Sequence, residues 1–307
     1  MRVFLTGGSG MVGRNILEHP YSRKHQILSP CSAKLNLLDR NAVYKALSEW
    51  MPDMVVHAAG RVGGIQANMS NPIRFLQDNL DMGVNVIAAA NSLGIPNLLN
   101  LSSSCMYPKD ASNPLTEDMI LTGALEPTNE GYALAKIVTT RLCEYISREN
   151  ESKNYKTVIP CNLYGPYDKY DPQHSHMIPA VIHKLHEAKE NGVRIVDIWG
   201  DGEARREFMS ARDLAEFIYY AIDHYQNMPQ NLNVGLGVDY SIKEYYQVIA
   251  SVVGYKGKFQ YDISKPVGMK QKLMDDSGLN DFGWHPKISL KEGLVDAYQF
   301  YKDKNLK

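Results

Sequence analysis

A tyrosine and a lysine four residues apart could perform acid–base chemistry. Tyr132 and Lys136 form a Tyr-x-x-x-Lys pattern in a segment that we predict to be helical, and residues i and i+4 share one face of a helix. An ammonium beside a phenol favours the phenolate and should lower the tyrosine pKa from about 10 toward working pH. Such a phenol could protonate the oxygen of a carbonyl that receives hydride. Because the pattern is common on helices, the argument depends on its position in the chain.

Further reactive side chains follow a predicted strand. Residues 97–102 are predicted to form this strand, and Ser103 and Cys105 come directly after it. A serine at the end of a strand can hydrogen-bond the same carbonyl as Tyr132. The thiol of Cys105, with an ordinary pKa of about 8.5, could remove or return a proton next to a ketone. The alternative is a small buried filler, which is the usual role of a lone free cysteine.

A glycine-rich turn near the start of the chain predicts a dinucleotide site. Gly7, Gly10 and Gly13 give a G-x-x-G-x-x-G pattern between a predicted strand, residues 2–6, and a predicted helix, residues 11–18. Glycine allows a tight turn, a close approach of backbone to pyrophosphate and close packing of the helix on the strand. The free N–H groups at the helix start would then face the phosphates.

The residues after the second predicted strand favour NADP(H). Residues 29–32 read Ser-Pro-Cys-Ser and contain no acid, whereas an acid at this place would bind the ribose 2′-OH and repel a 2′-phosphate. Arg14 and Lys34 could supply positive charge to that phosphate or be solvated surface cations. Asp39 could approach the adenine or only cap its helix.

Strands and helices alternate through the first half of the chain. This βαβαβ order predicts an α/β fold with a Rossmann-type, doubly wound and mostly parallel sheet. Strands are predicted at 2–6, 26–28, 54–57, 97–102 and 157–160, and helices at 11–18, 39–50, 71–92 and 129–148.

The pattern changes beyond about residue 165. Residues 164–174 are rich in Pro, Asp and Tyr and predict a functional loop. We expect an NADP(H)-binding Rossmann domain over residues 1–165 and a smaller, partly intertwined α/β lobe over 166–307. In the later part, strands are predicted at 194–199 and 232–235, and helices at 213–225, 243–253 and 290–303.

The composition argues against several classes of protein. With 33 basic and 34 acidic side chains, the formal net charge is -1, so no global field attracts nucleic acid or an anionic membrane. No apolar run approaches the roughly 18 residues of a membrane span. The first strand begins at once and leaves no room for a signal peptide, and the four cysteines lack the CxxC spacing of a zinc site. We therefore expect a cytoplasmic protein without a metal, nucleic-acid or membrane partner.

The glycine turn, the strand-end serine and the Tyr-x-x-x-Lys pattern, in this order, resemble the extended short-chain dehydrogenase/reductase superfamily. Within it, the chain resembles the GDP-L-fucose synthase family nearly end to end. Sugar 4,6-dehydratases of the superfamily carry Asp-Glu where this chain has Ser104 and Cys105, so a dehydratase is not expected. The segments that carry the family resemblance are 57–65 (HAAGRVGGI), 103–109 (SSCMYPK), 125–130 (LEPTNE), 162–166 (NLYGP), 175–180 (SHMIPA) and 206–208 (REF).

The resemblance implies a role for each matching residue. Ser103 orients the substrate, Tyr132 is the acid at C4, and Lys136 tunes Tyr132 and holds the nicotinamide ribose. Cys105 and His176 form an epimerisation pair, although a lone histidine is more often a packing or surface residue. With a pKa near about 6.5, His176 would be a fitting proton donor opposite a cysteine base. The implied contacts to the NADP(H) cofactor are Gly7, Gly10, Met11, Val12, Gly13, Asp39, Ala58, Ala59, Tyr132, Lys136 and His176.

The resemblance also implies contacts to a GDP-linked sugar, with one departure from the family pattern. Lys184 stands where arginine is expected, which keeps the charge but loses bidentate binding of pyrophosphate. Trp199 could stack on the base or be a core residue that ends a strand. The implied substrate contacts are Ser104, Asn162, Lys184, Trp199, Arg206 and Lys272.

The implied activity is an NADPH-dependent 3,5-epimerase/4-reductase that converts GDP-4-keto-6-deoxy-D-mannose to GDP-L-fucose. The alternative is a C4-reductase, with or without epimerisation, of a related GDP-4-keto-6-deoxy sugar such as the colitose precursor or a 6-deoxyheptose; Lys184 and the divergent loop 167–173 leave it open. A non-catalytic binding protein would commonly lose Tyr132 or Lys136, and both are present. By analogy with the family we also expect a homodimer through the helices at 71–92 and 129–148.

Overall fold

A six-stranded sheet in which every neighbouring pair is parallel forms the centre of the molecule, which confirms the predicted fold class. The computed structural model describes residues 1–171, 175–265 and 267–305. The strand order is β10-β5-β4-β3-β1-β2. The strands are β1 (Arg2–Thr6), β2 (Gln26–Leu28), β3 (Met54–His57), β4 (Asn97–Leu101), β5 (Asn154–Pro160) and β10 (Asn231–Val234).

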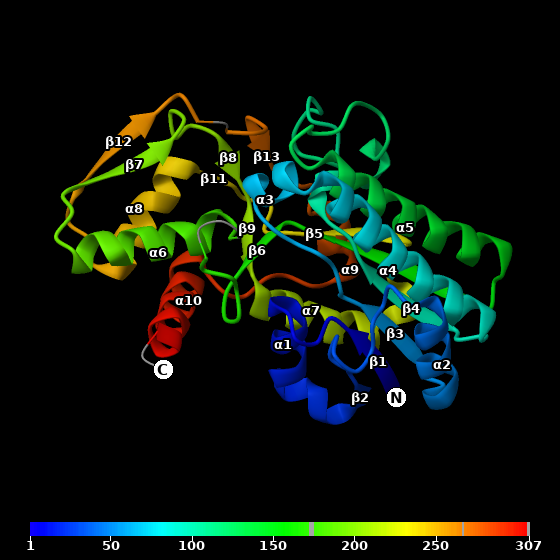
Figure 1. Cartoon of the computed structure of the whole chain (residues 1–307). Coiled ribbons are helices and arrows are strands. Elements are labelled where there is room, and N and C mark those ends of the chain that lie inside the picture. Colours follow the sequence, from blue (N-terminus) through cyan, green and yellow to red (C-terminus); the bar gives the residue numbers. More distant parts are fainter. Residues whose placement is uncertain (172–174, 266, 306–307) are drawn as a thin grey trace.

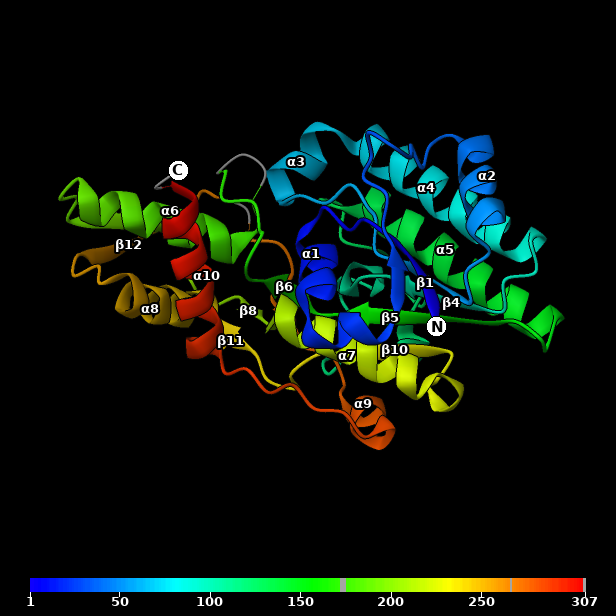
Figure 2. The ribbon, with the colours of Figure 1, turned by 90° about the horizontal axis from the view of Figure 1, so that it is seen from below.

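Helices cover both faces of this sheet, as Figures 1 and 2 show. On one face lie α2 (Arg40–Trp50), α4 (Pro72–Ser92) and α5 (Glu130–Glu149), and on the other lie α1 (Met11–Glu18) and α7 (Ala211–Asp223). Short helical segments join the layers: α3 (Ile65–Ser70), α9 (Ser277–Phe282) and the 3-10 turns η1 (Pro20–Lys24), η2 (Ser104–Met106), η3 (Glu117–Met119) and η4 (Tyr225–Asn227).

The central strands are apolar on both sides because both of their faces are covered. Successive side chains of a strand point to opposite faces. In β1, Val3 and Leu5 pack with the core under α1 and α7, whereas Phe4 packs with the core under α2, α4 and α5. Met54 and Val55 of β3 divide in the same way.

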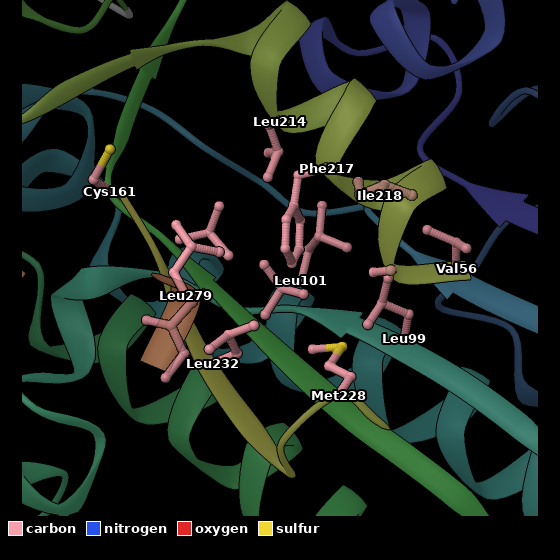
Figure 3. Close-up of a cluster of buried hydrophobic side chains, with 14 of the residues drawn as sticks. Val56, Leu99, Leu101, Cys161, Leu214, Phe217, Ile218, Met228, Leu232 and Leu279 are labelled. Atoms are coloured by element: carbon pink, nitrogen blue, oxygen red, sulfur yellow. The ribbon is translucent and has the colours of Figure 1, made fainter. Parts of the chain in front are cut away.

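The core under α7 is the larger of these two, and Figure 3 shows part of it. Phe217 of α7 points into this cluster, where Leu101 of β4 and Leu232 of β10 also lie. Strand β10 and helix α7 come from the second half of the chain, so residues far apart in sequence share this core.

A second, smaller lobe has its own core. It is built from α6 (Met177–Glu190), α8 (Ile242–Val253) and α10 (Leu290–Asn305), with the parallel pair β7 (Ile195–Trp199) and β12 (Lys258–Asp262). Two small sheets connect it to the larger part: β6 (Asn162–Tyr164) with β9 (Phe208–Ser210), and β11 (Tyr240–Ser241), β8 (Arg205–Arg206) and β13 (Gln271–Lys272). We refer to the group of α6, α8, α10, β7 and β12 as the second lobe.

Two elements differ from the sequence predictions for identifiable reasons. Helix α6 was not predicted, because it follows an irregular loop and carries Pro179 in its first turn, where a proline costs no helical hydrogen bond. Strand β5 begins three residues earlier than the predicted residue 157. The polar Lys156 hides the strand pattern there, although its ammonium is buried and donates to carbonyls in and just after η4, including that of Tyr225.

Across the described residues, the structure contains no helix of sufficient length and apolar character to cross a membrane.

The central core should dominate stability. Phe217 is fully buried, and truncation of a buried phenylalanine to alanine costs about 3–5 kcal/mol. We expect Phe217→Ala to lower the free energy of unfolding by that amount in urea titrations. Val295→Ala, at a position that is 51% exposed, is the control and should change it by less than about 0.5 kcal/mol. Similar losses in the two variants would contradict this assignment of the core.

Candidate active site

One cleft runs along the carboxyl edge of the large sheet and continues into the second lobe. Its volume is about 1740 Å³, and it extends from the turn after β1 to β7. Residues near the ends of β1, β3 and β4 line it on one side, and α6, β7, β8 and β13 line it on the other. The carboxyl edge is where open α/β sheets bind their ligands.

The turn after β1 has the geometry of a dinucleotide-binding turn. Gly7 has a φ of +75°, and a Cβ atom there would lie 2.7 Å from the backbone nitrogen and Cα of Ala59. Only glycine meets both conditions without strain. Helix α1 then begins at Met11 after Gly10, whose residue type provides no side-chain cap. The N–H groups of its first turn are therefore available to an anion such as a pyrophosphate.

Five other residues assigned to the cofactor lie where a bound dinucleotide could reach them. Met11, Val12, Gly13, Ala58 and Ala59 line the cleft beside the turn.

Asp39 lies outside the described lining of the cleft, and its carboxylate accepts hydrogen bonds from the N–H groups of Asn41 and Ala42 at 2.9 and 3.1 Å. The sequence left two roles open for Asp39, contact with adenine or a helix cap. In the structure it caps α2. Arg14 also lies outside this lining and stacks 5.3 Å from the ring centre of Tyr167.

Tyr132, Lys136 and Ser103 meet at the middle of the cleft. Helix α5 carries the first two, and its packing places the Nζ of Lys136 5.8 Å from the centre of the Tyr132 ring. That ammonium donates a 2.8 Å hydrogen bond to the carbonyl of Leu101, the last residue of β4. Ser103, two residues after Leu101, lies near Tyr132 and lowers the pKa of its phenol.

The expectation that Lys136 lowers the pKa of Tyr132 is wrong for this structure. Burial raises the pKa of Tyr132 far above 10, the nearby Cys105 adds to the rise, and the hydrogen bond from Ser103 opposes it. Burial also lowers the pKa of Lys136 to about 8, against the smaller effect of Cys105. Desolvation has the largest effect because a phenolate in this position would lose the water that stabilises its charge. The phenol remains protonated, which is the form that a general acid needs.

Cys105 and His176 also line the cleft, on elements from different halves of the chain. Cys105 is buried in η2, directly after β4, and its N–H faces the hydroxyl of Ser103 at 3.4 Å. His176 is the residue before α6. The structure therefore places the two residues that the sequence assigned to epimerisation in the lining of the same cleft.

Both residues are uncharged near neutral pH. Burial raises the pKa of Cys105, and the charges of Lys272 and Lys136 oppose the rise. Burial lowers the pKa of His176 to about 4, and Lys169 and Lys272 lower it further. The value near 6.5 expected for His176 is therefore wrong, because desolvation and two nearby cations favour the neutral imidazole.

The residues assigned to the nucleotide sugar are placed differently from one another. Asn162, Trp199, Arg206 and Lys272 line the cleft, and Trp199 is 37% exposed rather than a core residue. Arg206 and Lys272 are opposite each other in the β8–β13 pair. In the described part of the chain neither has an ion-pair partner.

Two other assigned residues are less available to a substrate. Lys184 lines the cleft, but its Nζ lies 3.0 Å from a carboxylate oxygen of Asp197 and donates to the Asp197 carbonyl. An anionic substrate would have to compete with that carboxylate. Ser104 is buried in η2 and lies outside the described lining of the cleft.

The loop after β6 contributes a residue that the sequence did not single out. Lys169 lines the cleft, donates to the carbonyl of Val62 across it at 3.2 Å, and affects the pKa of His176. The Pro-, Asp- and Tyr-rich composition of this segment was the available signal. Residues 172 and 173 of the divergent loop 167–173 lie outside the described part of the chain, as does residue 174.

Comparisons with known proteins agree with this geometry. The model of the NAD dependent epimerase/dehydratase family matches residues 3–235, which is more than half of the chain. The chain belongs to this family. The matched residues include the glycine turn, the Tyr132–Lys136 pair and both members of the Cys105–His176 pair.

Individual members of the epimerase/dehydratase family align over almost the whole chain. The chain is 56% identical to "GDP-L-colitose synthase" of Yersinia pseudotuberculosis, with 98% of each chain covered. It is 48% identical to "GDP-L-fucose synthase" of Azorhizobium caulinodans, with 98% of this chain and 96% of the relative covered. A solved GDP-mannoheptose C4 reductase from Campylobacter jejuni with NADP bound superposes with a TM-score of 0.88 at 30% identity, and 98% of each chain is covered.

The turn at Gly7 offers a direct test of the cofactor site. We expect Gly7→Ala to weaken NADPH binding, measured by fluorescence titration, by more than about tenfold. The positive φ alone costs about 1–3 kcal/mol, and the added methyl group would overlap Ala59.

Gly192→Ala is the matched control. Gly192 has a φ of +66°, but nothing lies within 4 Å of its Cβ position. This variant should share the backbone strain and keep the affinity for NADPH. Equal losses of affinity in both variants would mean that the approach to Ala59 plays no part in binding.

Proposed function

We propose that the protein is an NADPH-dependent 3,5-epimerase/4-reductase that converts GDP-4-keto-6-deoxy-D-mannose to GDP-L-fucose. The observation that carries the proposal is the convergence of Tyr132, Lys136, Cys105 and His176 on one cleft that also includes the glycine turn. A phenol with a buried lysine suits carbonyl reduction. A thiol and an imidazole in the same cleft suit proton exchange beside that carbonyl.

NADP(H) is the proposed cofactor. The strained, close-packed turn at Gly7 and the uncapped start of α1 suit a pyrophosphate, and no acid follows β2 to repel a 2′-phosphate. The bound NADP in the heptose reductase from Campylobacter jejuni supports the same choice. When bound, the nicotinamide would supply the hydride for C4 of the sugar.

Reduction needs a proton at the sugar oxygen, and Tyr132 would provide it. Its phenol is buried and protonated, and Ser103 lies beside it to hold the carbonyl oxygen. Lys136, fixed by Leu101, would share the developing negative charge on the phenol after the proton has moved. The products of this step are the alcohol at C4 and a tyrosinate, which regains its proton from solvent.

Epimerisation needs proton removal on one face of the sugar ring and proton return on the other. The 4-keto group acidifies the hydrogens on C3 and C5. Cys105 and His176 form a complementary neutral pair, in which the thiol can give a proton and the imidazole can accept one; this reverses the cysteine base and histidine donor expected from the sequence. Lys272 and Lys136 would stabilise the thiolate that remains on Cys105. Removal at one face and return at the other invert the centre and leave no net charge.

We further propose a division of labour between the two parts of the chain. Residues 1–165 would hold the cofactor, and residues 166–307 would hold the GDP-linked sugar, with Arg206 and Lys272 at the diphosphate and Trp199 near the base. Cations that line the cleft without carboxylate partners in the described structure suit a diphosphate.

A second candidate is a reductase that acts on the precursor of colitose. The observation that favours it is the 56% identity to GDP-L-colitose synthase, compared with 48% to the fucose synthase of Azorhizobium caulinodans. A dideoxyhexose of the colitose type has one hydroxyl fewer, so only one centre beside the ketone could be inverted. The ratio of kcat/KM for the two GDP-4-keto sugars would decide between the candidates.

The proposed chemistry predicts separable losses. With NADPH and GDP-4-keto-6-deoxymannose, Tyr132→Phe should reduce NADPH oxidation by about 10²–10⁴-fold, because it removes the general acid. Cys105→Ser should reduce deuterium incorporation at C3 and C5 more than it reduces NADPH oxidation. NADPH consumption is followed by absorbance, and exchange and product stereochemistry by NMR.

Val295→Ala, on the exposed side of α10, is the control and should retain both activities. Absence of turnover by the wild-type protein on any GDP-4-keto sugar would contradict the proposed function. Retention of configuration at C3 and C5 would leave a reductase without epimerase activity.

We also propose that the protein is a cytoplasmic homodimer. Helices α4 and α5 pack side by side at the outside of the molecule (Figure 1). Their surface includes the exposed Leu134, Val138 and Tyr145 on α5 and Ile73 on α4, which is 68% exposed. Apolar side chains grouped on adjacent helices suit a two-fold interface.

The dimer can be tested by light scattering after size-exclusion chromatography. The wild-type chain should elute with twice the 34.6 kDa mass of the monomer. Val138→Glu should shift it to the monomer, because a charge would be buried in the interface. Val295→Glu, on the exposed side of α10, should not. A monomeric wild-type protein would exclude this assembly.

A further inference from the structure

Glu207 is a buried acid that the chemistry described above does not use. It lies between β8 and β9, is 1% exposed, and stays outside the described lining of the cleft. Its neighbour in sequence, Arg206, lines the cleft. Glu207 can therefore affect a substrate only through the residues that it holds.

The carboxylate of Glu207 is surrounded by backbone N–H donors. Its Oε1 atom accepts from Leu236 and Gly237, and its Oε2 atom accepts from Met274 at 3.1 Å. No described lysine, arginine or histidine forms an ion pair with it. The space exists because residue 235 is glycine, where any Cβ would overlap the carboxylate.

These donors belong to two segments that are far apart in the sequence. Leu236 and Gly237 directly follow β10, an edge strand of the large sheet. Met274 follows Lys272 of β13 by two residues, and Lys272 is paired with Arg206 of β8. One carboxylate thus joins the large sheet to the strand pair that carries the two cations of the cleft.

A second path leads from Met274 to the catalytic edge of the sheet. Met274 forms a bridge with Leu115, whose carbonyl accepts from the side chain of Asn233 in β10. The oxygen of that side chain accepts from the hydroxyl of Tyr107. Tyr107 follows η2, the turn that contains Cys105. A chain of contacts therefore connects Met274 with η2 as well as with the β8–β13 pair.

We propose that Glu207 is a positioning residue whose ionised carboxylate holds Arg206 and Lys272 at the spacing that a GDP-linked sugar requires. This inference rests on the function proposed above. A carboxylate accepts hydrogen bonds at both oxygens, whereas a carboxylic acid presents an O–H at one of them. A proton at Oε2 makes that oxygen a weaker acceptor for the N–H of Met274, so protonation would loosen the end of β13.

The surroundings of Glu207 place this change near neutral pH. Burial raises the pKa of Glu207 to about 7 against the effect of its three N–H donors, and Asp276 at the start of α9 raises it further. The other titratable groups that face it are Cys161 and Tyr245, and burial raises the pKa of each. Because the folded-state pKa lies above the unfolded value, ionisation of Glu207 costs stability as pH rises through this range.

The experiment measures the affinity for GDP-mannose, a probe that needs no turnover. Its diphosphate is a diester, so the charge of the probe is constant between about pH 5.8 and about pH 7.8. We expect wild-type protein to bind it about tenfold more weakly at the lower pH in isothermal titration calorimetry, because one charge-assisted hydrogen bond is lost. Glu207→Gln should bind at both pH values as the wild type does at the lower one, because its amide NH₂ also opposes Met274.

Two further variants complete the test. Asp213→Asn is the matched control, since Asp213 is also 1% exposed and accepts from two backbone N–H groups, but at α7; it should keep the wild-type pH dependence. Glu207→Asp keeps the charge and should retain a pH-dependent affinity, which serves as the readout if Glu207→Gln does not fold.

The outcomes distinguish this inference from the function on which it rests. Wild-type pH dependence in Glu207→Gln, or an affinity of Glu207→Asp that does not change with pH, would overturn the positioning role alone. An absence of GDP-mannose binding by the wild-type protein at both pH values would overturn the nucleotide-sugar function as well.

Discussion

Partial removal of the reactive side chains from water is the constraint on which the chemistry of the cleft depends. The phenol of Tyr132 and the thiol of Cys105 keep their protons, and the imidazole of His176 stays neutral, because burial has the largest effect on each pKa. The cations Lys136 and Lys272 act against that background rather than setting it. Because the three groups that would exchange protons are neutral, the cations beside them remain available to stabilise the negative charge that each transfer leaves behind.

The fold class could be read from the sequence, as could most of the residues that line the cleft, whereas the pKa values of those residues could not. Strand and helix periods located the large sheet, and the spacing of Tyr132 and Lys136 marked the catalytic helix. The sequence could not show that Lys136 donates to Leu101 or that Lys184 pairs with Asp197. Such partners are set by tertiary packing, which a sequence does not show. The pKa of Tyr132 was predicted to fall, but it rises because the phenol is desolvated.

The sequence analysis also did not predict the shortest strands. Strands of two or three residues, such as β8 and β13, have no detectable period, yet they carry Arg206 and Lys272. Their positions depend on hydrogen bonds to remote backbone, above all those that converge on Glu207. These contacts organise the part of the cleft at β8 and β13. In the sequence, their only sign is an acidic residue followed by an aromatic one.

The late return of the chain to the large sheet has a consequence for synthesis. Strand β10 completes the edge of the sheet beside β5, and α7 covers one of its faces, yet both come after the loop that leads into the second lobe. As the polypeptide emerges from the ribosome, the first five strands have an open edge and an uncovered apolar face until residue 234 has been translated. The nascent nucleotide-binding half is therefore exposed to premature association for a long part of translation, and the two halves of the enzyme must mature as one cooperative unit.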